Sequence, residues 1–436
     1  MTSYVETNQE EIYAKRRLSL NKQMPGTLAI FASSAELRMD GDVSVPYRQD
    51  PDYLYLTGCI EPGGLLVLET RKGKTKSVLY LVERNPERER WDGPLIGLSK
   101  AKQIFHVDEV RDRKNFSQDL PTLAKGLPTV SLNWGSNPDV DNTVWRWFSE
   151  QKKRIAPSPL TLGDSRVLTL PMRLKKEPLE IEFMKKAIWI TGEALGRVCQ
   201  ADISGLDEKT IASRIELEFT SLGSEHVAFP TIVASGKNAV CLHHSPSRAL
   251  LKKGSLVLID CGATWKGYNA DITRTYPIAG QLSPAQSQVY SIVRAAMRKA
   301  IRAAKPGATL ARIHKQAAQA IDSGLRDLGI LKQRTTTATQ EEDSYKKYFM
   351  HGTSHLLGLS VHERVPPLTS PHGDLLDPKD VPLPENSVLT IEPGLYFPVN
   401  DTSIPKEFRG IGIRLEDDIR ISAQGAEILS GEIPFE

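Results

Sequence analysis

Cysteine is scarce in this sequence. Only four cysteines occur among 436 residues, and no two of them stand in a CxxC spacing. The chain therefore lacks the cysteine pattern of a zinc ribbon. The four thiols, Cys59, Cys199, Cys241 and Cys261, lie among apolar or small residues, which is typical of reduced cysteines in a reducing compartment.

Long apolar runs and a strong net charge are missing as well. No stretch approaches the roughly 20 apolar residues that a membrane-spanning helix needs. Residues 1–15 are polar and acidic, unlike a signal or transit peptide. A formal net charge of +3 gives no electrostatic footprint for nucleic acid. We therefore expect a soluble, cytoplasmic protein with no membrane and no nucleic-acid partner.

Three familiar catalytic motifs are also absent. The sequence contains no G-x-S-x-G elbow, no H-E-x-x-H helix and no P-loop. The enzyme classes that depend on these motifs are therefore excluded. Any chemistry has to come from another arrangement of polar side chains.

The length of the chain suggests two or three domains. Short strands alternate with helical patterns in the first third, which favours an α/β domain. We expect helices near 9–24, 97–103 and 117–126, and strands near 27–32, 53–57, 64–69, 77–82, 104–107 and 128–133. The segment 156–159 has a linker composition, and we place the boundary between 157 and 175, which gives domains 1–170 and 171–436.

The second domain combines long amphipathic helices with strands that carry polar residues. The apolar periodicity predicts helices at 177–201, 207–223, 283–305 and 308–328, and strands near 387–392, 395–398 and 411–420. We expect this domain to be α+β.

One stretch of the second domain, residues 256–276 (LVLIDCGATWKGYNADITRTY), predicts a β-hairpin that carries two carboxylates. A turn near Trp265 and Lys266 would place Asp260 and Asp271 opposite each other, with Cβ atoms about 5 Å apart. Two carboxylates that close do not both stay ionised cheaply unless a cation lies between them. Two solvated aspartates on an ordinary hairpin remain the alternative.

Histidines cluster further along the chain. Three of the nine histidines, His351, His355 and His362, fall within residues 351–363 (HGTSHLLGLSVHE). A lone histidine is usually a core or surface residue, but three in an apolar, glycine-punctuated segment favour a functional site. Packing or surface roles remain the alternative for each of them.

Charged residues interrupt two later strands. VLTIEPG ends its apolar run in Glu392, and a buried charge is costly unless it is paired or coordinated. In GIGIRLEDD, strand alternation puts Gly412, Arg414 and Glu416 on one face, where we expect the glycines to leave open space beside the two charges. A solvent-exposed Glu392 and a surface Arg–Glu ladder are the alternatives.

Together these segments supply four carboxylates and one imidazole: Asp260, Asp271, His355, Glu392 and Glu416. An oxygen-rich set of this kind suits two hard or borderline divalent cations. Some carboxylates would have to bridge the two ions, and a water between two cations loses a proton readily. The set thus predicts a hydroxide nucleophile that needs neither serine nor cysteine.

The order of these pieces resembles a known family. Asp260 with Asp271 eleven residues later, then HGxSHxLGLxVH, TIEPGLY and GIGIRLEDD, is similar to the metal-binding signature of the pita-bread metallopeptidases. Within that superfamily, nearly the whole chain resembles the aminopeptidase P (Xaa-Pro aminopeptidase) family. PYRQ at 46–49 and YLYLTG at 53–58 resemble its N-terminal domain. The resemblance implies an α/β N-terminal domain followed by an α+β pita-bread catalytic domain.

The resemblance also implies a metal centre of two divalent ions, with manganese the favoured metal. By position, Asp260 would chelate one ion, Asp271 and Glu416 would bridge both ions, and His355 and Glu392 would complete the second.

Further residues match other active-site positions of the family. The implied catalytic residues are Glu392 (general base or proton shuttle), His243, His362 and Arg414, and the implied substrate-binding residues are His351, Tyr396, Trp91 and Asp42. Trp91 would close the substrate pocket. Asp42 would reach the active site of a neighbouring subunit, so a homodimer or homotetramer is expected. We interpret His244, which departs from the family pattern, as a surface residue.

The implied activity is release of the N-terminal residue from peptides with proline in second position, by attack of a metal-bridging hydroxide. A prolidase, which cleaves only Xaa-Pro dipeptides, and a non-catalytic pita-bread module are the alternatives. The PYRQ and YLYLTG runs favour aminopeptidase P over the prolidase. The presence of all five ligand types disfavours the non-catalytic module.

Overall fold

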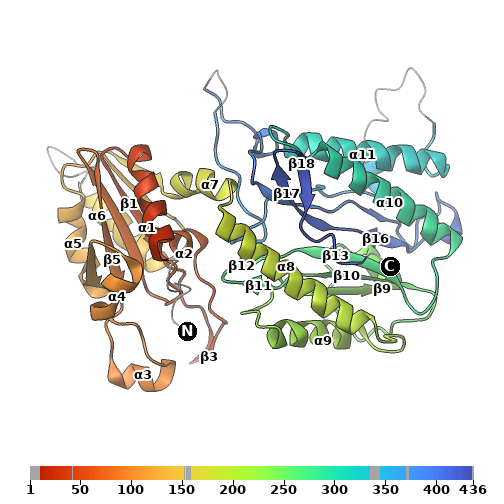
Figure 1. The fold of residues 1–436 in the computed structure, drawn as a ribbon, viewed down its shortest axis with the longest axis horizontal. Helices are drawn as coiled ribbons and strands as arrows, with labels where there is room; N and C mark the ends of the chain where they lie inside the picture. The colour runs from red at the N-terminus through yellow and green to blue at the C-terminus, as the bar shows by residue number, and fades with distance from the viewer. Residues whose placement is uncertain are drawn as a thin grey trace. The chain divides into compact units, whose positions relative to one another are not determined.

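The computed structural model describes residues 10–41, 43–151, 153, 159–333, 344–369 and 373–434. The chain divides into two compact units, Met1–Met172 and Arg173–Glu436 (Figure 1). The division falls two residues beyond the expected end of the first domain at residue 170.

The first unit is built on a six-stranded sheet in the order β6-β5-β4-β1-β7-β8. Strand β1 pairs antiparallel with β4 and parallel with β7, so the sheet is mixed. Apolar side chains of helices α5 and α6 pack against the strands to form the core. The strands are β1 (Thr27–Ala32), β4 (Leu65–Arg71), β5 (Lys74–Leu81), β6 (Glu109–Asp112), β7 (Thr129–Leu132) and β8 (Thr161–Asp164), and the helices include α1 (Glu10–Ser19), α4 (Leu98–Phe105), α5 (Phe116–Leu123) and α6 (Pro138–Gln151).

Two strands expected in this unit are wrong. Residues 53–57 belong to helix α2 (Pro51–Thr57), because Asp50 caps the backbone N–H groups of Asp52 and Tyr53 and Pro51 starts the helix. Gly58 ends that helix with a φ of 69°. The strand expected near 104–107 is instead the end of α4, and β6 begins only at Glu109.

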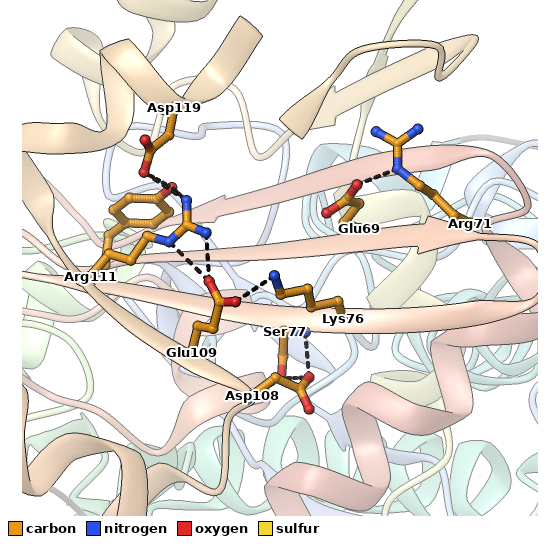
Figure 2. Close-up of polar contacts among 9 residues, drawn as sticks. Glu69, Arg71, Lys76, Ser77, Asp108, Glu109, Arg111 and Asp119 are labelled. Carbon is orange, nitrogen blue, oxygen red and sulfur yellow. Dashed lines mark hydrogen bonds and ion pairs between the residues drawn. The ribbon is translucent and has the colours of Figure 1, made fainter. Parts of the chain in front are cut away.

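The outer strand β6 carries charged side chains that are paired with each other, with the neighbouring strand β5 and with helix α5 (Figure 2). Glu109 Oε1 lies 2.5 Å from Lys76 Nζ, and Glu109 Oε2 lies 2.5 Å from Arg111 Nη2. Arg111 Nη1 lies 2.8 Å from Asp119 Oδ2. Charges on an outer strand discourage pairing with another chain. This strand therefore protects the edge of the sheet.

The second unit consists of two halves, each with a helix pair on a small sheet. Figure 1 shows the helix pairs on opposite sides of the strands. One half packs α8 (Pro178–Cys199) and α9 (Glu208–Ser221) on β9 (Ile232–Ser235), β10 (Leu256–Cys261) and β13 (Ile272–Pro277). The other packs α10 (Pro284–Ala303) and α11 (Leu310–Asp327) on β14 (Val388–Ile391), β15 (Gly394–Tyr396), β16 (Gly412–Arg414) and β17 (Asp417–Ser422), with β18 (Gly425–Ile428) beside β17. The four long helices are those expected from the sequence.

The hairpin around Asp260 exists, but its predicted register is wrong. In the antiparallel pair β10–β13, Asp260 lies opposite Thr273, and Asp271 precedes the first residue of β13. The residues between them fold into a separate ribbon, β11 (Thr264–Trp265) and β12 (Tyr268–Asn269). The two aspartates are therefore diagonal rather than facing, which increases the spacing between their Cα atoms to about 7–8 Å.

The strand expected at 411–420 is broken. Strand β16 ends at Arg414 and β17 begins at Asp417, so Glu416 stands between two strands. Its backbone N–H donates to the carbonyl of Thr273, 3.0 Å away on β13. The expectation of open space at Gly412 is also wrong, because a Cβ there would lie 2.1 Å from the carbonyl oxygen of Ala239.

Two further features are the state of the cysteines and the character of the helices. All four cysteines lie in the described part of the chain and are free, and Cys59 and Cys261 are buried. Among the described residues, no helix combines the length and the apolar character needed to cross a bilayer.

Replacing Gly412 by alanine tests the close packing of β16. We expect Gly412→Ala to lower the unfolding free energy by about 3 kcal/mol, because the added methyl group collides with a backbone carbonyl that side-chain motion does not clear. Urea unfolding of the variant measures the loss. Gly196→Ala is the control, since a methyl group there meets nothing closer than 3.9 Å and alanine favours the helix by about 1 kcal/mol. Equal stability of the two variants would contradict this account of Gly412.

Candidate metal centre

Strand alternation directs Asp260 away from the helix core of its half. On β10, Val257, Ile259 and Cys261 belong to the apolar cluster under α8 and α9. Asp260 lies between Ile259 and Cys261 in sequence, so its side chain points to the opposite face of the sheet. The same face carries Thr273, the partner of Asp260 across the β10–β13 pair.

Three of the five expected ligands converge within the described part of the chain. Asp271, His355 and Glu416 each offer one ligand atom, and these atoms all lie within 4.8 Å of one another. Glu392, which follows β14, extends the group, because its Oε1 lies 3.7 Å from His355 Nε2. His355 Nε2 lies 3.4 Å from Asp271 Oδ2. Four expected ligands from four separate segments are thus brought together.

Asp260, the fifth expected ligand, is paired with an arginine side chain. Its Oδ2 accepts a hydrogen bond from Arg414 Nη2 at 2.5 Å, while its buried Oδ1 finds no donor among the described residues. A buried carboxylate oxygen without a partner is uncommon and indicates a missing one. Asp260 therefore has one oxygen free for an ion.

The electrostatics of the cluster fit a bound cation. Desolvation and neighbouring carboxylates raise the pKa of Asp271 to about 6 and that of Glu392 to about 7, and burial raises the pKa of Glu416 well above its usual range. Burial disfavours charge on His355, but Asp271 and Glu392 outweigh it and raise its pKa to about 9. A divalent cation would remove the repulsion among these groups. Carboxylate oxygens and one imidazole are suitable donors for such an ion.

Hydrogen-bonding groups behind the expected ligands orient them. Thr273 donates its hydroxyl to Glu416 at 2.6 Å and receives a hydrogen bond from Arg414 Nε at 3.1 Å. The backbone N–H of Asp271 donates to Asp418 at 3.1 Å. Hydrogen bonds of this kind fix the orientation of ligand side chains.

The sequence reasoning did not identify Thr273 and Asp418 as site residues. A signal for Thr273 was present, since it stands two residues after Asp271 and therefore on the same face of the strand. Asp418 carried no such signal, because it is one of two adjacent aspartates after Glu416. It is fully buried in the fold.

A chain of polar groups leads away from the cluster through His351. Its Nδ1 lies 2.7 Å from the Gly352 carbonyl and its Nε2 lies 2.9 Å from the Tyr396 hydroxyl. Burial and the nearby Arg414 charge lower the pKa of His351 to about 4, so the ring is neutral at pH 7. The carbonyl can only accept, so Nδ1 carries the hydrogen and Nε2 accepts from Tyr396. The Tyr396 hydroxyl accepts in turn from Arg414 Nη1 at 3.1 Å.

Two further expected histidines are exposed and lie near the cluster. The ring of His362 meets that of His355 edge to face, with centroids 4.2 Å apart. Desolvation and His355 lower the pKa of His362. His243 also contributes to the lowered pKa values of His351 and His362, so it lies within electrostatic reach of both.

The remaining sequence assignments have different outcomes. Trp91 lies on helix α3 (Pro86–Asp92) of the first unit with 86% of its surface exposed. Asp42 lies outside the described residues. The interpretation of His244 as a surface residue is wrong, because its Nε2 lies 2.8 Å from the buried carboxylate of Glu208.

The cluster is a candidate site for divalent metal, and comparison with known proteins identifies the class as a metallopeptidase and then the family. Residues 182–423 match the family described as Metallopeptidase family M24, and residues 13–131 match the family described as Aminopeptidase P, N-terminal domain. The chain belongs to the aminopeptidase P family of metallopeptidases, whose activity is that of an Xaa-Pro aminopeptidase. The family, the fold class and the enzyme class predicted from the sequence are thereby confirmed.

Full-length relatives are similar to this chain. The Xaa-Pro aminopeptidase of Escherichia coli K12 is 33% identical over 98% of this chain and 96% of its own length. The protein of Arabidopsis thaliana named "Intermediate cleaving peptidase 55, mitochondrial" is 32% identical over 98% of this chain and 81% of its own length.

Solved structures extend the similarity to three dimensions. Proline aminopeptidase P II from Yersinia pestis is 34% identical, with a TM-score of 0.89 over 98% of this chain and 97% of that one. Aminopeptidase P from E. coli with the inhibitor Pro-Leu is 32% identical, with a TM-score of 0.88 over 99% of this chain and 97% of that one. A zinc-substituted E. coli aminopeptidase P with product has a TM-score of 0.89, at 32% identity over 99% of this chain and 97% of that one.

Asparagine variants test the different positions of the two aspartates. We expect Asp271→Asn to reduce bound metal by about two ions per chain, since Asp271 is central to the cluster, and Asp260→Asn to reduce it by about one. Elemental analysis of the purified variants measures the metal content. Asp322→Asn on α11 is the control, because Asp322 is buried against Arg326 in that helix and is not a member of the cluster. Full metal content in Asp271→Asn would refute the assignment.

The raised pKa values also predict that metal binding releases protons. Without metal, Asp271, Glu392 and His355 hold protons up to pH values of about 6, 7 and 9. Affinity for a divalent cation therefore rises as the pH increases through about 5 to 9 and becomes constant above that range. Calorimetric titration in two buffers of different ionisation enthalpy measures the released protons. Binding at pH 6.5 without proton release would contradict the prediction.

Proposed function

We propose that the cluster of Asp260, Asp271, His355, Glu392 and Glu416 holds two divalent ions. With them the enzyme removes the N-terminal residue from peptides that have proline in second position. The observation that carries this proposal is the convergence of Asp271, His355 and Glu416 within 4.8 Å, in a chain of the aminopeptidase P family. Asp260 would hold one ion, and His355 and Glu392 would hold the other, while Asp271 and Glu416 would be shared between the two.

When bound, such ions polarise the substrate carbonyl and lower the pKa of water to a range in which it is a nucleophile at neutral pH. Glu392 is the acceptor of the proton that the nucleophile loses, since its carboxylate stands between two histidines. Its Oε2 lies 3.7 Å from His351 Nδ1 and its Oε1 lies 3.7 Å from His355 Nε2.

The neutral imidazole of His351 orients the substrate. Its tautomer is fixed by the Gly352 carbonyl and by Tyr396, which Arg414 holds in turn. His243 and His362 are exposed at the cluster and can contact the peptide. We assign to them the binding of the scissile carbonyl and the delivery of a proton to the leaving nitrogen.

The chemistry of the bond explains why a dedicated site is needed. The bond before proline is a tertiary amide with a rigid ring and no N–H. A peptidase that grips its substrate as an extended strand loses a hydrogen bond there. Recognition has to depend on the ring, the free amine and the preceding carbonyl.

Three finer points belong to the same proposal. Manganese is the proposed metal, supported by the oxygen-rich donor set, although the zinc-substituted relative accepts another ion. A homodimer or homotetramer is supported by exposed apolar side chains on the β2–β3 ribbon (Arg38–Asp40, Val43–Ser44), where Met39 is 73% and Val43 54% exposed. The cytoplasm is supported by the free cysteines, while the Arabidopsis relative is named as mitochondrial.

Substrate length separates the proposed aminopeptidase from a prolidase. After chelation and addition of Mn²⁺, we expect an Xaa-Pro-Xaa tripeptide to be cleaved with at least about tenfold higher kcat/KM than the Xaa-Pro dipeptide. Binding energy from the third residue then contributes to the transition state. Chromatography of the products measures both rates, and a peptide with alanine in place of proline is the control. Preference for the dipeptide would contradict the assignment as an aminopeptidase and favour a prolidase. Full activity in the chelated enzyme would refute the metal mechanism.

A further inference from the structure

A second buried carboxylate lies outside the metal centre. Glu208 is the first residue of α9, and its side chain is fully buried. Its Oε1 accepts from the Ser235 N–H at 2.7 Å, the Ser235 hydroxyl at 2.9 Å and Asn238 Nδ2 at 2.9 Å. Its Oε2 accepts from His244 Nε2 at 2.8 Å, the Ser247 N–H at 3.0 Å and the Ser247 hydroxyl at 2.7 Å. One carboxylate thus gathers six hydrogen bonds from a single segment.

The arrangement closes residues 235–247 into a loop whose two ends are held at one point. Ser235 is the last residue of β9, and Ser247 lies twelve positions later at the far end of the loop. The backbone strengthens the closure, because the Lys209 N–H donates to the Ser247 carbonyl at 3.0 Å. Burial alone would raise the pKa of Glu208, but the hydrogen bonds lower it to about 2, so the anchor is anionic. It can therefore only accept, and His244 Nε2 is the donor.

The loop carries His243 next to the anchored His244. His243 is exposed and lies within electrostatic reach of His351 and His362. The start of the loop also packs against β16, in the half of the unit covered by α10 and α11. The Ala239 carbonyl fills the space beside Gly412 on the strand that ends in Arg414, and Ala239 shares an apolar cluster with Tyr396.

We propose that Glu208 is a positioning residue, which holds both ends of the 235–247 loop and thereby fixes His243 against the substrate. This inference rests on the role of His243 in the proposed peptidase reaction. Charge-assisted hydrogen bonds to one buried anion leave the loop few alternative conformations. A small displacement of a group that contacts substrate lowers the rate markedly.

A double-mutant cycle separates positioning from simple stabilisation. In Glu208→Gln, the amide keeps the shape of the side chain. Its NH2 group, however, is a hydrogen-bond donor and would face N–H and O–H groups that are also donors. We expect kcat/KM for an Xaa-Pro-Xaa peptide to fall roughly 10- to 100-fold, with metal content unchanged. In a His243→Ala background the same change should lower kcat/KM by no more than about twofold, because the group that Glu208 positions is already gone.

Two further variants keep the test decisive if Glu208→Gln folds poorly. Ser247→Ala removes one hydroxyl donor and leaves the carboxylate, so it should show a smaller loss that again disappears in the His243→Ala background. Asp322→Asn is the matched control, a buried carboxylate on α11 whose loss should combine additively with His243→Ala.

A readout independent of activity distinguishes failure of this inference from failure of the proposed function. In protein labelled with ¹³C-histidine, the ring signal of His243 is identified by its loss in His243→Ala. We expect this signal to shift or broaden in Glu208→Gln. An unchanged His243 signal in Glu208→Gln would overturn the positioning role. The role would also be overturned if Glu208→Gln lowered kcat/KM by the same factor in the His243→Ala background as in the wild type. A wild-type enzyme that fails to cleave Xaa-Pro-Xaa peptides would instead overturn the proposed function.

Discussion

The second unit depends on one constraint, the placement of four carboxylates where water is largely excluded. Asp260, Asp271 and Glu416 are each less than 10% exposed, and Glu392 is only partly exposed. Acids so close together and so poorly hydrated are unfavourable as anions unless cations neutralise them. The protein supplies two positive groups, Arg414 beside Asp260 and His355 beside Asp271. Glu392 and Glu416 add to the negative charge of the cluster, and divalent ions would balance the charge that these two groups leave.

The fold places three of the four acids where a strand begins, ends or breaks, while Asp260 lies within β10. Asp271 precedes β13, Glu392 follows β14, and Glu416 stands between β16 and β17. At such positions the backbone is free to form bonds between segments. The N–H of Glu392 donates to the Thr353 carbonyl at 2.8 Å, and that of Glu416 donates to the Thr273 carbonyl at 3.0 Å. The bond from Glu416 to Thr273 thus joins the two halves of the unit through a residue of the cluster itself.

Residue types and their order were sufficient to predict which acidic and histidine side chains come together, but they did not predict how the hairpin strands pair. Asp260 and Asp271 were correctly placed in one hairpin, but its turn lies at Lys266 and Gly267, one residue later than predicted, so Asp260 pairs with Thr273 and the same register continues through the β11–β12 ribbon. The turn position depends on the left-handed backbone of Lys266 and Gly267, with φ of 52° and 81°, and an error of one residue in the turn moves every cross-strand partner by two positions. Helix α2 was missed for a different reason, since a capped seven-residue helix rich in tyrosine and leucine has the composition of a strand.

Two kinds of buried acid in this unit have opposite properties, and the difference lies in their donors. Burial disfavours charge on both Glu208 and Glu416. Six donors around Glu208 overcome that effect and lower its pKa, whereas Glu416 receives a hydroxyl hydrogen bond from Thr273 and faces other carboxylates, which raise its pKa further. A carboxylate saturated with donors has no lone pair left for a ligand and serves as an anchor. A carboxylate with few donors keeps its oxygens available, and that incomplete satisfaction is what suits the cluster to bind cations.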